Sequence, residues 1–295
     1  MKILLFGSRG QLGQALSQAL NDLYKLHLSH RGDCDLTVTS QIEILINSVK
    51  PDLIINSAAY TNVDAAESNQ AETFAINAKA PEIMAKKASI LGIPLIHFST
   101  DYVFDGLKEY KYIESDLENP QSQYAKTKYL GEEAIRKYLP EHIILRTSWI
   151  YSHHHQKNFV YKIINQLSQD KFFNVVNDEW GSPTPANFIA QSILKIIPYL
   201  KDKVFGTYHL TSLGKTTRYS CASFIEKELI RLGKIEALQS KRVSPILSIQ
   251  YQLIAKRPTH AILNCAKIKR TFVLEFKTWQ DELSHFLCES FPKGL

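Results

Sequence analysis

Short apolar runs alternate with amphipathic stretches through the first half of the chain, and this alternation constrains the fold more than any other feature. Residues 3–6 form an apolar run, a glycine-rich turn follows, and leucines and alanines then recur at helical spacing. The order continues through predicted strands at 25–29, 52–56, 93–98 and 142–147 and predicted helices near 40–49, 69–91 and 121–138. Strands that alternate with helices require right-handed crossovers. We therefore predict an α/β fold built on a Rossmann-type doubly wound parallel sheet.

The second half of the chain has a looser pattern. The whole chain, with 295 residues, is long enough for two domains of about 150 residues each. Beyond Trp149, prolines interrupt shorter helices and strands. We predict a dinucleotide-binding domain at 1–150 and a smaller substrate-binding lobe at 151–295 that is interleaved with the sheet.

The charges are scattered along the chain rather than gathered into blocks. The 35 basic and 29 acidic residues leave a net charge of +6, which suits an anionic ligand but does not predict a nucleic-acid partner. No apolar run approaches the roughly 18 residues that span a bilayer. We expect no export signal, no membrane partner and a cytoplasmic location.

Cysteines and histidines give no metal signature. The four cysteines form no CxxC pair, and we expect them to be buried, reduced thiols. Three adjacent histidines on one loop, 153–155, cannot all face one ion, and no carboxylate or thiol set accompanies them. We therefore predict no metal site. Trp180 and Trp279 are interpreted as packing residues rather than substrate platforms.

Three glycines stand at the first junction between strand and helix. Gly7, Gly10 and Gly13 are spaced GxxGxxG. A phosphate can approach the backbone closely where no Cβ intervenes, and a helix N-terminus offers it free N–H groups. A tight turn alone would also use such glycines, but their position at the first strand end favours dinucleotide binding.

Cofactor choice depends on the end of the second strand, where an acid would hold the ribose 2′-hydroxyl of NAD. Ser29, His30 and Arg31 stand there instead, and Arg9 is available from the glycine loop. We predict NADPH as the preferred cofactor, with NADH as the alternative because a nearby aspartate could turn toward the ribose. A solvated turn is the other interpretation of this segment.

The ends of two later strands carry small or hydroxylated residues. Ala58 and Ala59 follow the third strand and would let a cofactor lie against the backbone. Thr100 follows the fourth strand, within the run 99–102, and a hydroxyl at that edge can donate to a carbonyl oxygen that becomes negative during reduction.

Tyr124 and Lys128 form a YxxxK pair that places both side chains on one face of a helix. A tyrosine donates or accepts a proton near neutral pH only when a neighbouring ammonium stabilises its phenolate. A second match, Tyr199 with Lys203, lies far from the hydroxyl-bearing strand ends. Position therefore favours Tyr124 and Lys128 as the catalytic pair.

Several segments together resemble the dTDP-4-dehydrorhamnose reductases, a family of extended short-chain dehydrogenases. They are GSRGQLG (7–13), NSAAYTNVD (56–64), STDYVFDG (99–106), YAKTK (124–128) and RTSW (146–149), and the likeness continues through WGSPT (180–184). The resemblance covers essentially the whole chain. It implies reduction by NAD(P)H of the C4 keto group of a dTDP-linked 4-keto-6-deoxy sugar, which gives dTDP-L-rhamnose.

The resemblance also assigns residues. It implies that Thr100, Tyr124 and Lys128 are catalytic, that Asp101, Tyr102 and Trp149 meet the sugar, and that the following residues line the cofactor: Gly10, Gln11, Leu12, Asp35, Leu36, Ala58, Ala59 and Tyr60. It leaves a homodimer open. The family is sometimes associated with Mg²⁺, but no ligand set in the sequence predicts it.

Two other interpretations remain open at this stage. One is another sugar-nucleotide reductase or epimerase of the same superfamily, since Asn264 stands where the family often has aspartate. The other is a non-catalytic regulatory subunit with the same fold. Intact Thr100, Tyr124 and Lys128 argue against a subunit that has no need of a proton donor.

Overall fold

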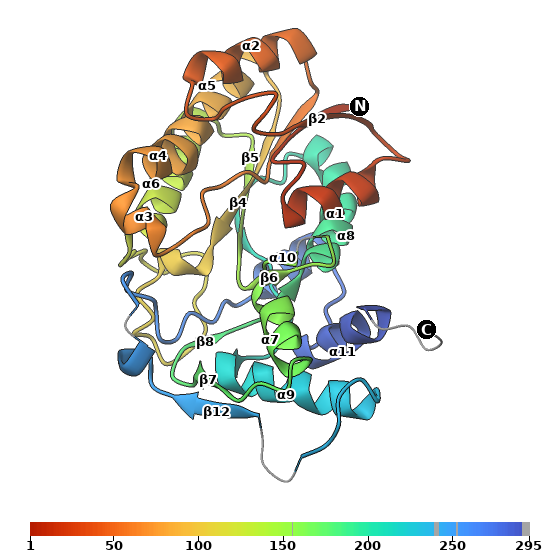
Figure 1. Cartoon of the computed structure of the whole chain (residues 1–295). Coiled ribbons are helices and arrows are strands. Elements are labelled where there is room, and N and C mark those ends of the chain that lie inside the picture. Colours follow the sequence, from red (N-terminus) through yellow and green to blue (C-terminus); the bar gives the residue numbers. More distant parts are fainter. Residues whose placement is uncertain (155, 239–241, 252, 291–295) are drawn as a thin grey trace.

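A six-stranded parallel sheet forms the centre of the protein (Figure 1). The computed structural model describes residues 1–154, 156–238, 242–251 and 253–290. The strands, in the spatial order β10-β5-β4-β3-β1-β2, are β1 (Lys2–Phe6), β2 (Lys25–Ser29), β3 (Leu53–Asn56), β4 (Leu95–Thr100), β5 (His142–Thr147) and β10 (Gly206–His209). Every pairing in this sheet is parallel. The predicted Rossmann-type α/β fold is confirmed.

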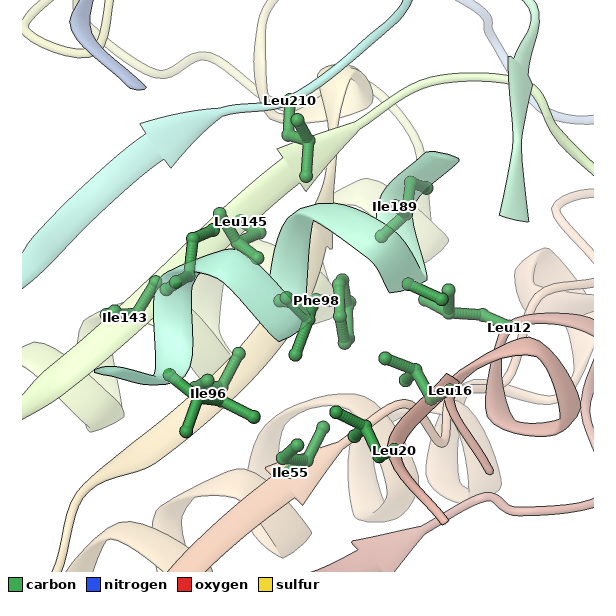
Figure 2. Packing of buried hydrophobic residues seen from close by; sticks show 14 of the residues in the cluster. Leu12, Leu16, Leu20, Ile55, Ile96, Phe98, Ile143, Leu145, Ile189 and Leu210 are labelled. Carbon is green, nitrogen blue, oxygen red and sulfur yellow. The ribbon is translucent and has the colours of Figure 1, made fainter. Parts of the chain in front are cut away.

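Helices cover both faces of the sheet, as the buried apolar strands require. On one face lie α1 (Gln11–Leu20) and α8 (Ala186–Ile196), and on the other lie α2 (Thr39–Val49), α5 (Ala80–Leu91) and α6 (Gln123–Tyr138). Figure 2 shows Leu12, Leu16 and Leu20 of α1 and Ile189 of α8 in one cluster with Ile96 and Phe98 of β4. This packing fixes the carboxyl ends of the strands on one edge.

The stretch 69–91, expected to be helical, consists of several helical segments. It contains α4 (Gln70–Phe74), a π-helical turn at Ala75–Lys79 and then α5, after the short α3 (Ala65–Ser68). Asn77 in the π turn accepts a hydrogen bond from the Tyr60 amide at 2.8 Å and donates to the Tyr60 carbonyl at 3.1 Å. The irregular turn therefore holds the loop that follows β3.

The C-terminal half contributes to the sheet as well as to a separate lobe. β10 pairs with β5, α8 packs on α1, and α10 (Ala266–Phe272) packs beside them. The remaining lobe contains α7 (Phe159–Leu167), β7 (Phe173–Val176), α9 (Arg218–Arg231), β12 (Val243–Ile246) and α11 (Trp279–Ser290). Short pairs join β6 (Ile150–Tyr151) to β9 (Thr184–Pro185) and β8 (Trp180–Gly181) to β11 (Thr216–Thr217). A single boundary at residue 150 therefore does not divide the structure into two bodies.

The burial of the cysteines is confirmed for three of the four. The cysteines are free thiols, and Cys34, Cys221 and Cys265 are buried as expected, but Cys288 is exposed on α11. Within the residues that the structure describes, no helix has the length and apolar character needed to cross a membrane.

Candidate active site

The glycine turn between β1 and α1 is packed tightly against the end of β3. Gly7 has φ +80°, and a Cβ built there would lie 2.6 Å from the Ala58 nitrogen. A Cβ on Gly13 would lie 2.0 Å from the Gly7 carbonyl oxygen. Both distances are too short for any side chain, so the sequence must keep glycine at these positions.

A cavity of about 880 Å³ opens above this turn. All the residues predicted to contact the cofactor line it, except Gly13, which packs beneath the turn: Gly7, Gly10, Gln11, Leu12, Arg31, Asp35, Leu36, Ala58, Ala59 and Tyr60. Lys157 and Asn158, which precede α7, also line it, so the lobe contributes one wall. The cavity volume is of the size typical for a cofactor site.

Basic groups border the cavity at the end of β2. Arg31 is mostly exposed and pairs with Glu72 of α4 at 3.1 Å between Nη2 and Oε1. His30 pairs with Asp33 at 2.8 Å. The Asp35 carboxylate accepts hydrogen bonds from the amide and hydroxyl of Thr37, which hold its pKa below the ordinary value. Both acids near the strand end are thus engaged within the protein.

Tyr124 and Lys128 lie near the start of α6 and line the same cavity. Ser122 caps this helix by accepting from the Ala125 amide at 3.3 Å, which fixes where the first turn begins. Burial raises the pKa of Tyr124 and is opposed by a hydrogen bond with Thr100. Burial lowers the pKa of Lys128 to about 8. The structure therefore brings the predicted Thr100, Tyr124 and Lys128 together.

Asp101 is buried behind Thr100 rather than open to the cavity. Its carboxylate accepts from the Thr100 hydroxyl at 3.1 Å and from the Ser148 hydroxyl at 2.7 Å. Burial raises the pKa of Asp101 to about 6, against the opposing effect of these hydrogen bonds. The geometry gives Asp101 a direct part in orienting Thr100.

We expect the Asp101 carboxylate to destabilise the fold as the pH rises. Its pKa in the folded protein, about 6, exceeds the ordinary 3.8, so its contribution to stability is complete below about pH 4 and is lost as the pH rises through 6. Between pH 5 and pH 8, the wild type should lose about 1–2 kcal/mol of unfolding free energy relative to Asp101→Asn. Urea denaturation at the two pH values measures this.

Asp105 is the control for this measurement. Hydrogen bonds, first from the Leu107 amide, hold the pKa of Asp105 below its ordinary value, so it stays ionised from pH 5 to pH 8. Asp105→Asn should therefore follow the wild-type pH trend. Parallel trends for wild type and Asp101→Asn would contradict the burial argument.

Trp149 follows β5 with an unusual backbone, φ +44°. Its indole packs where a Cβ on Gly181 would clash, and the Arg218 guanidinium stacks over it at 4.3 Å. Arg218 also pairs with the buried Glu179 at 3.2 Å between Nε and Oε2. Tyr102 packs edge-to-face against Tyr124 at 6.0 Å. Of the residues predicted to meet the sugar, Asp101 and Tyr102 thus lie close to Tyr124, and the lining of the cofactor cavity includes none of the three.

The other two tryptophans, interpreted as core or lobe packing residues, have different surroundings. Trp279 is 5% exposed and packs against Phe224, as expected. Trp180 is 36% exposed, with Lys215 stacked 4.9 Å from its ring centroid. Trp180 is therefore not a core residue, and its interpretation as a packing residue of the lobe, beside Lys215 and His260, remains a prediction.

The second tyrosine–lysine match is structural. Tyr199 packs edge-to-face on Phe272, and Lys203 is exposed at the end of a 3₁₀ helix. Of the histidine run, His153 stacks on Phe286, and His155 lies outside the described residues. Among the residues with a described structure, no three His, Cys, Asp or Glu side chains are grouped so that they could hold a metal.

Sequence reasoning missed three buried polar residues around the site. Asn56 ends β3, Asn77 lies in the π turn, and His97 lies inside β4, each no more than 1% exposed. His97 was the detectable one, because it interrupts an apolar strand. Nothing local in the sequence indicates Asn77, since its partner Tyr60 is 17 residues away.

Comparison with known proteins shows the family of this chain. The model of the family described as RmlD substrate binding domain matches residues 1–291. The dTDP-4-dehydrorhamnose reductase of Sinorhizobium fredii is 37% identical over 95% of each chain, and that of Escherichia coli K12 is 36% identical over 99% of this chain and 98% of its own. The chain belongs to the dTDP-4-dehydrorhamnose reductase family.

Solved structures of this reductase family share the fold over nearly the whole chain. A dTDP-4-dehydrorhamnose reductase from Clostridium acetobutylicum has a TM-score of 0.89 at 32% identity and covers 98% of this chain and 99% of its own. The Bacillus anthracis reductase, solved in complex with NADP, also has a TM-score of 0.89, at 28% identity over 98% of this chain and 99% of its own. The predicted resemblance to these NAD(P)H-dependent oxidoreductases is confirmed.

Proposed function

We propose that this reductase converts dTDP-4-dehydro-6-deoxy-L-mannose into dTDP-L-rhamnose with NADPH, as the last step of dTDP-rhamnose synthesis. The observation that carries the proposal is that Tyr124 and Lys128 line the same cavity as the glycine turn. A nicotinamide cofactor and a proton donor would then meet at one edge of the sheet. The names of the relatives supply the sugar nucleotide.

The chain fits a dinucleotide. The glycine turn packs directly on the backbone at Ala58, where a Cβ on Gly7 would clash, and the start of α1 lines the cavity beside it. A bound nicotinamide supplies the hydride. Mg²⁺ has no support from these residues.

Three side chains act on the keto oxygen in this proposal. The Tyr124 hydroxyl gives its proton to the oxygen as C4 receives the hydride, so the C=O bond becomes C–OH. The Thr100 hydroxyl, which points its one proton at Asp101 in the structure, would turn that proton to the developing alkoxide when the sugar is bound. Lys128, one helical turn from Tyr124, would lower the cost of the phenolate in its ammonium form, which predominates below its pKa of about 8.

The sugar itself would lie between the sheet edge and the lobe. Trp149 offers an apolar wall that suits the C6 methyl group, and Tyr102 lies beside Tyr124. Asp101 would act on the sugar through Thr100, from which its carboxylate accepts a hydrogen bond, and its direct contact with the sugar remains a prediction.

An assay with the pure sugar nucleotide tests the proposal. The decrease of NADPH absorbance with dTDP-4-dehydro-6-deoxy-L-mannose, followed by identification of the product, should give dTDP-L-rhamnose. Turnover of a different 4-keto sugar nucleotide in preference would assign another reductase of the superfamily. NADPH binding without turnover of any such sugar would favour a regulatory subunit.

Cofactor preference has its own test at Arg31. A 2′-phosphate carries about two negative charges, and Arg31 and Arg9 both border the cavity. Arg31→Ala should therefore raise the KM for NADPH about 10-fold while the KM for NADH changes little. The ratio of the two KM values, from initial rates, measures the effect.

Arg231 provides the matched control for Arg31. It is also an exposed arginine paired with a glutamate, Glu228, but it lies on α9 in the lobe. Arg231→Ala should leave the ratio unchanged. An unchanged ratio in Arg31→Ala as well would mean that the end of β2 is a solvated turn.

A homodimer and a cytoplasmic location remain predictions.

A further inference from the structure

A chain of buried side chains connects the end of β3 to Lys128. His97, in the middle of β4, is completely buried. Its Nδ1 lies 3.0 Å from Asn56 Nδ2, and its Nε2 lies 3.2 Å from Lys128 Nζ. The imidazole therefore bridges the strand that carries Ala58 at its end and the helix that carries Tyr124.

The direction of the hydrogen bonds follows from the Asn56 amide. Its Oδ1 accepts from the Ala58 N–H at 3.1 Å, so its NH₂ group faces His97 and donates to Nδ1. Burial, and next the nearby Lys128, hold the pKa of His97 well below its ordinary value, so the ring is neutral. A neutral imidazole that accepts at Nδ1 carries its proton on Nε2. That N–H is directed at Lys128.

The Lys128 amino group thus faces one hydrogen-bond acceptor and one hydrogen-bond donor. Lys128 Nζ donates to the Phe98 carbonyl at 2.6 Å, while the His97 N–H offers a donor to which only an uncharged amine can respond as acceptor. Glu132, on the same helix, opposes this by favouring the ammonium. From the other packed elements, His142 of β5 acts on His97. Tyr124 shares the helix face with Lys128.

We propose that His97 is a positioning residue of this reductase: its Nε2–H, fixed by the Asn56 amide, holds the Lys128 amino group and favours the neutral amine over the ammonium. The consequence for catalysis rests on the proposed function. Lysine can then release and regain a proton beside Tyr124 near neutral pH, which a solvated ammonium with a pKa near 10 does not do. This role goes beyond the Tyr124–Lys128 pair itself.

Two substitutions separate the two ends of the imidazole. In His97→Asn, the side-chain oxygen replaces Nδ1 toward Asn56, but nothing reaches Lys128. In His97→Gln, an amide reaches Lys128, but it loses its contact with Asn56 and is free to turn its oxygen to the ammonium. Both changes remove the fixed N–H, so both should favour the ammonium.

The readouts are the pH dependence of NADPH affinity, by fluorescence titration, and that of kcat/KM. NADPH affinity and kcat/KM should each fall at alkaline pH as Lys128 loses its charge, and this fall is the alkaline limb of the pH profile. In both His97 variants the alkaline limb should shift upward by about one pH unit. His209→Asn is the control: His209 is also buried in the sheet, on β10, and its Nδ1 bonds the Tyr112 carbonyl rather than Lys128. It should lower the melting temperature without moving the limb.

The outcomes are distinguishable. An unmoved limb in both His97 variants, with a lowered melting temperature, would reduce His97 to a packing residue and overturn the proposal. NADPH affinity that is independent of pH in the wild type would overturn it too. Wild-type protein that binds NADPH with a limb that moves in the variants, but that reduces no sugar nucleotide, would support the inference while contradicting the proposed function.

Discussion

Replacing Tyr124 by phenylalanine is expected to lower kcat about 10²- to 10⁴-fold while NADPH still binds, because the hydroxyl is the proposed general acid. The ring is retained, so its edge-to-face contact with Tyr102 should persist. Steady-state kinetics with the sugar nucleotide give kcat, and fluorescence titration gives the affinity for NADPH.

Tyr199→Phe is the matched control for this prediction. Tyr199 has the same YxxxK spacing to Lys203 but packs on Phe272 away from the cavity. The control should keep wild-type activity. If Tyr124→Phe retained more than a third of the activity, Tyr124 would not be the acid.

The second large effect concerns stability. Arg146 and Glu132 are both completely buried, and Arg146 donates from Nε to Glu132 Oε1 at 3.0 Å and from Nη2 to Glu132 Oε2 at 2.6 Å. Arg146→Met should lower the unfolding free energy by about 3–5 kcal/mol, because it leaves the buried Glu132 charge with Arg136 as its remaining ion-pair partner and also removes a partner of Glu118. Urea denaturation measures the loss.

A double variant separates the unpaired charge from lost packing. Adding Glu132→Leu to Arg146→Met removes the buried carboxylate, and most of the lost stability should return because apolar residues of similar volume replace the pair. Failure of the second substitution to restore stability would show that the unpaired Glu132 charge is not the main cost, which would then come from packing or from Glu118, the other partner of Arg146.

Features that depend only on residues close together in the sequence could be predicted from the sequence. The glycine turn, the apolar strands and the Tyr124–Lys128 spacing are all short-range patterns, and the structure places these residues around one cavity. Gly7 and Gly13 illustrate the reason: the backbone itself fills the space that a Cβ would need.

The rest depends on partners that are distant in sequence. Asn77 acts through Tyr60, His97 through Asn56 and Lys128, and Asp101 through Ser148, 47 residues later. A polar residue in an apolar strand indicates a buried partner but does not say which one. The partial exposure of Trp180 was not predictable for the same reason, because it depends on how the short strands β8 and β11 of the second half pair.

The pairing of β10 with β5 has a consequence for how the chain is made and cut. Ile143, Ile144 and Leu145 are completely buried, and their strand has an open edge until residues 206–209 arrive from the ribosome. During that interval, unpaired N–H and C=O groups beside apolar side chains can join to another nascent chain. A fragment that ends near residue 150 lacks β10, so the edge of β5 stays unpaired. We therefore expect that residues 1–150 do not form a stable domain on their own. Chimaeras that exchange substrate lobes need to leave β10 and α8 with the N-terminal partner.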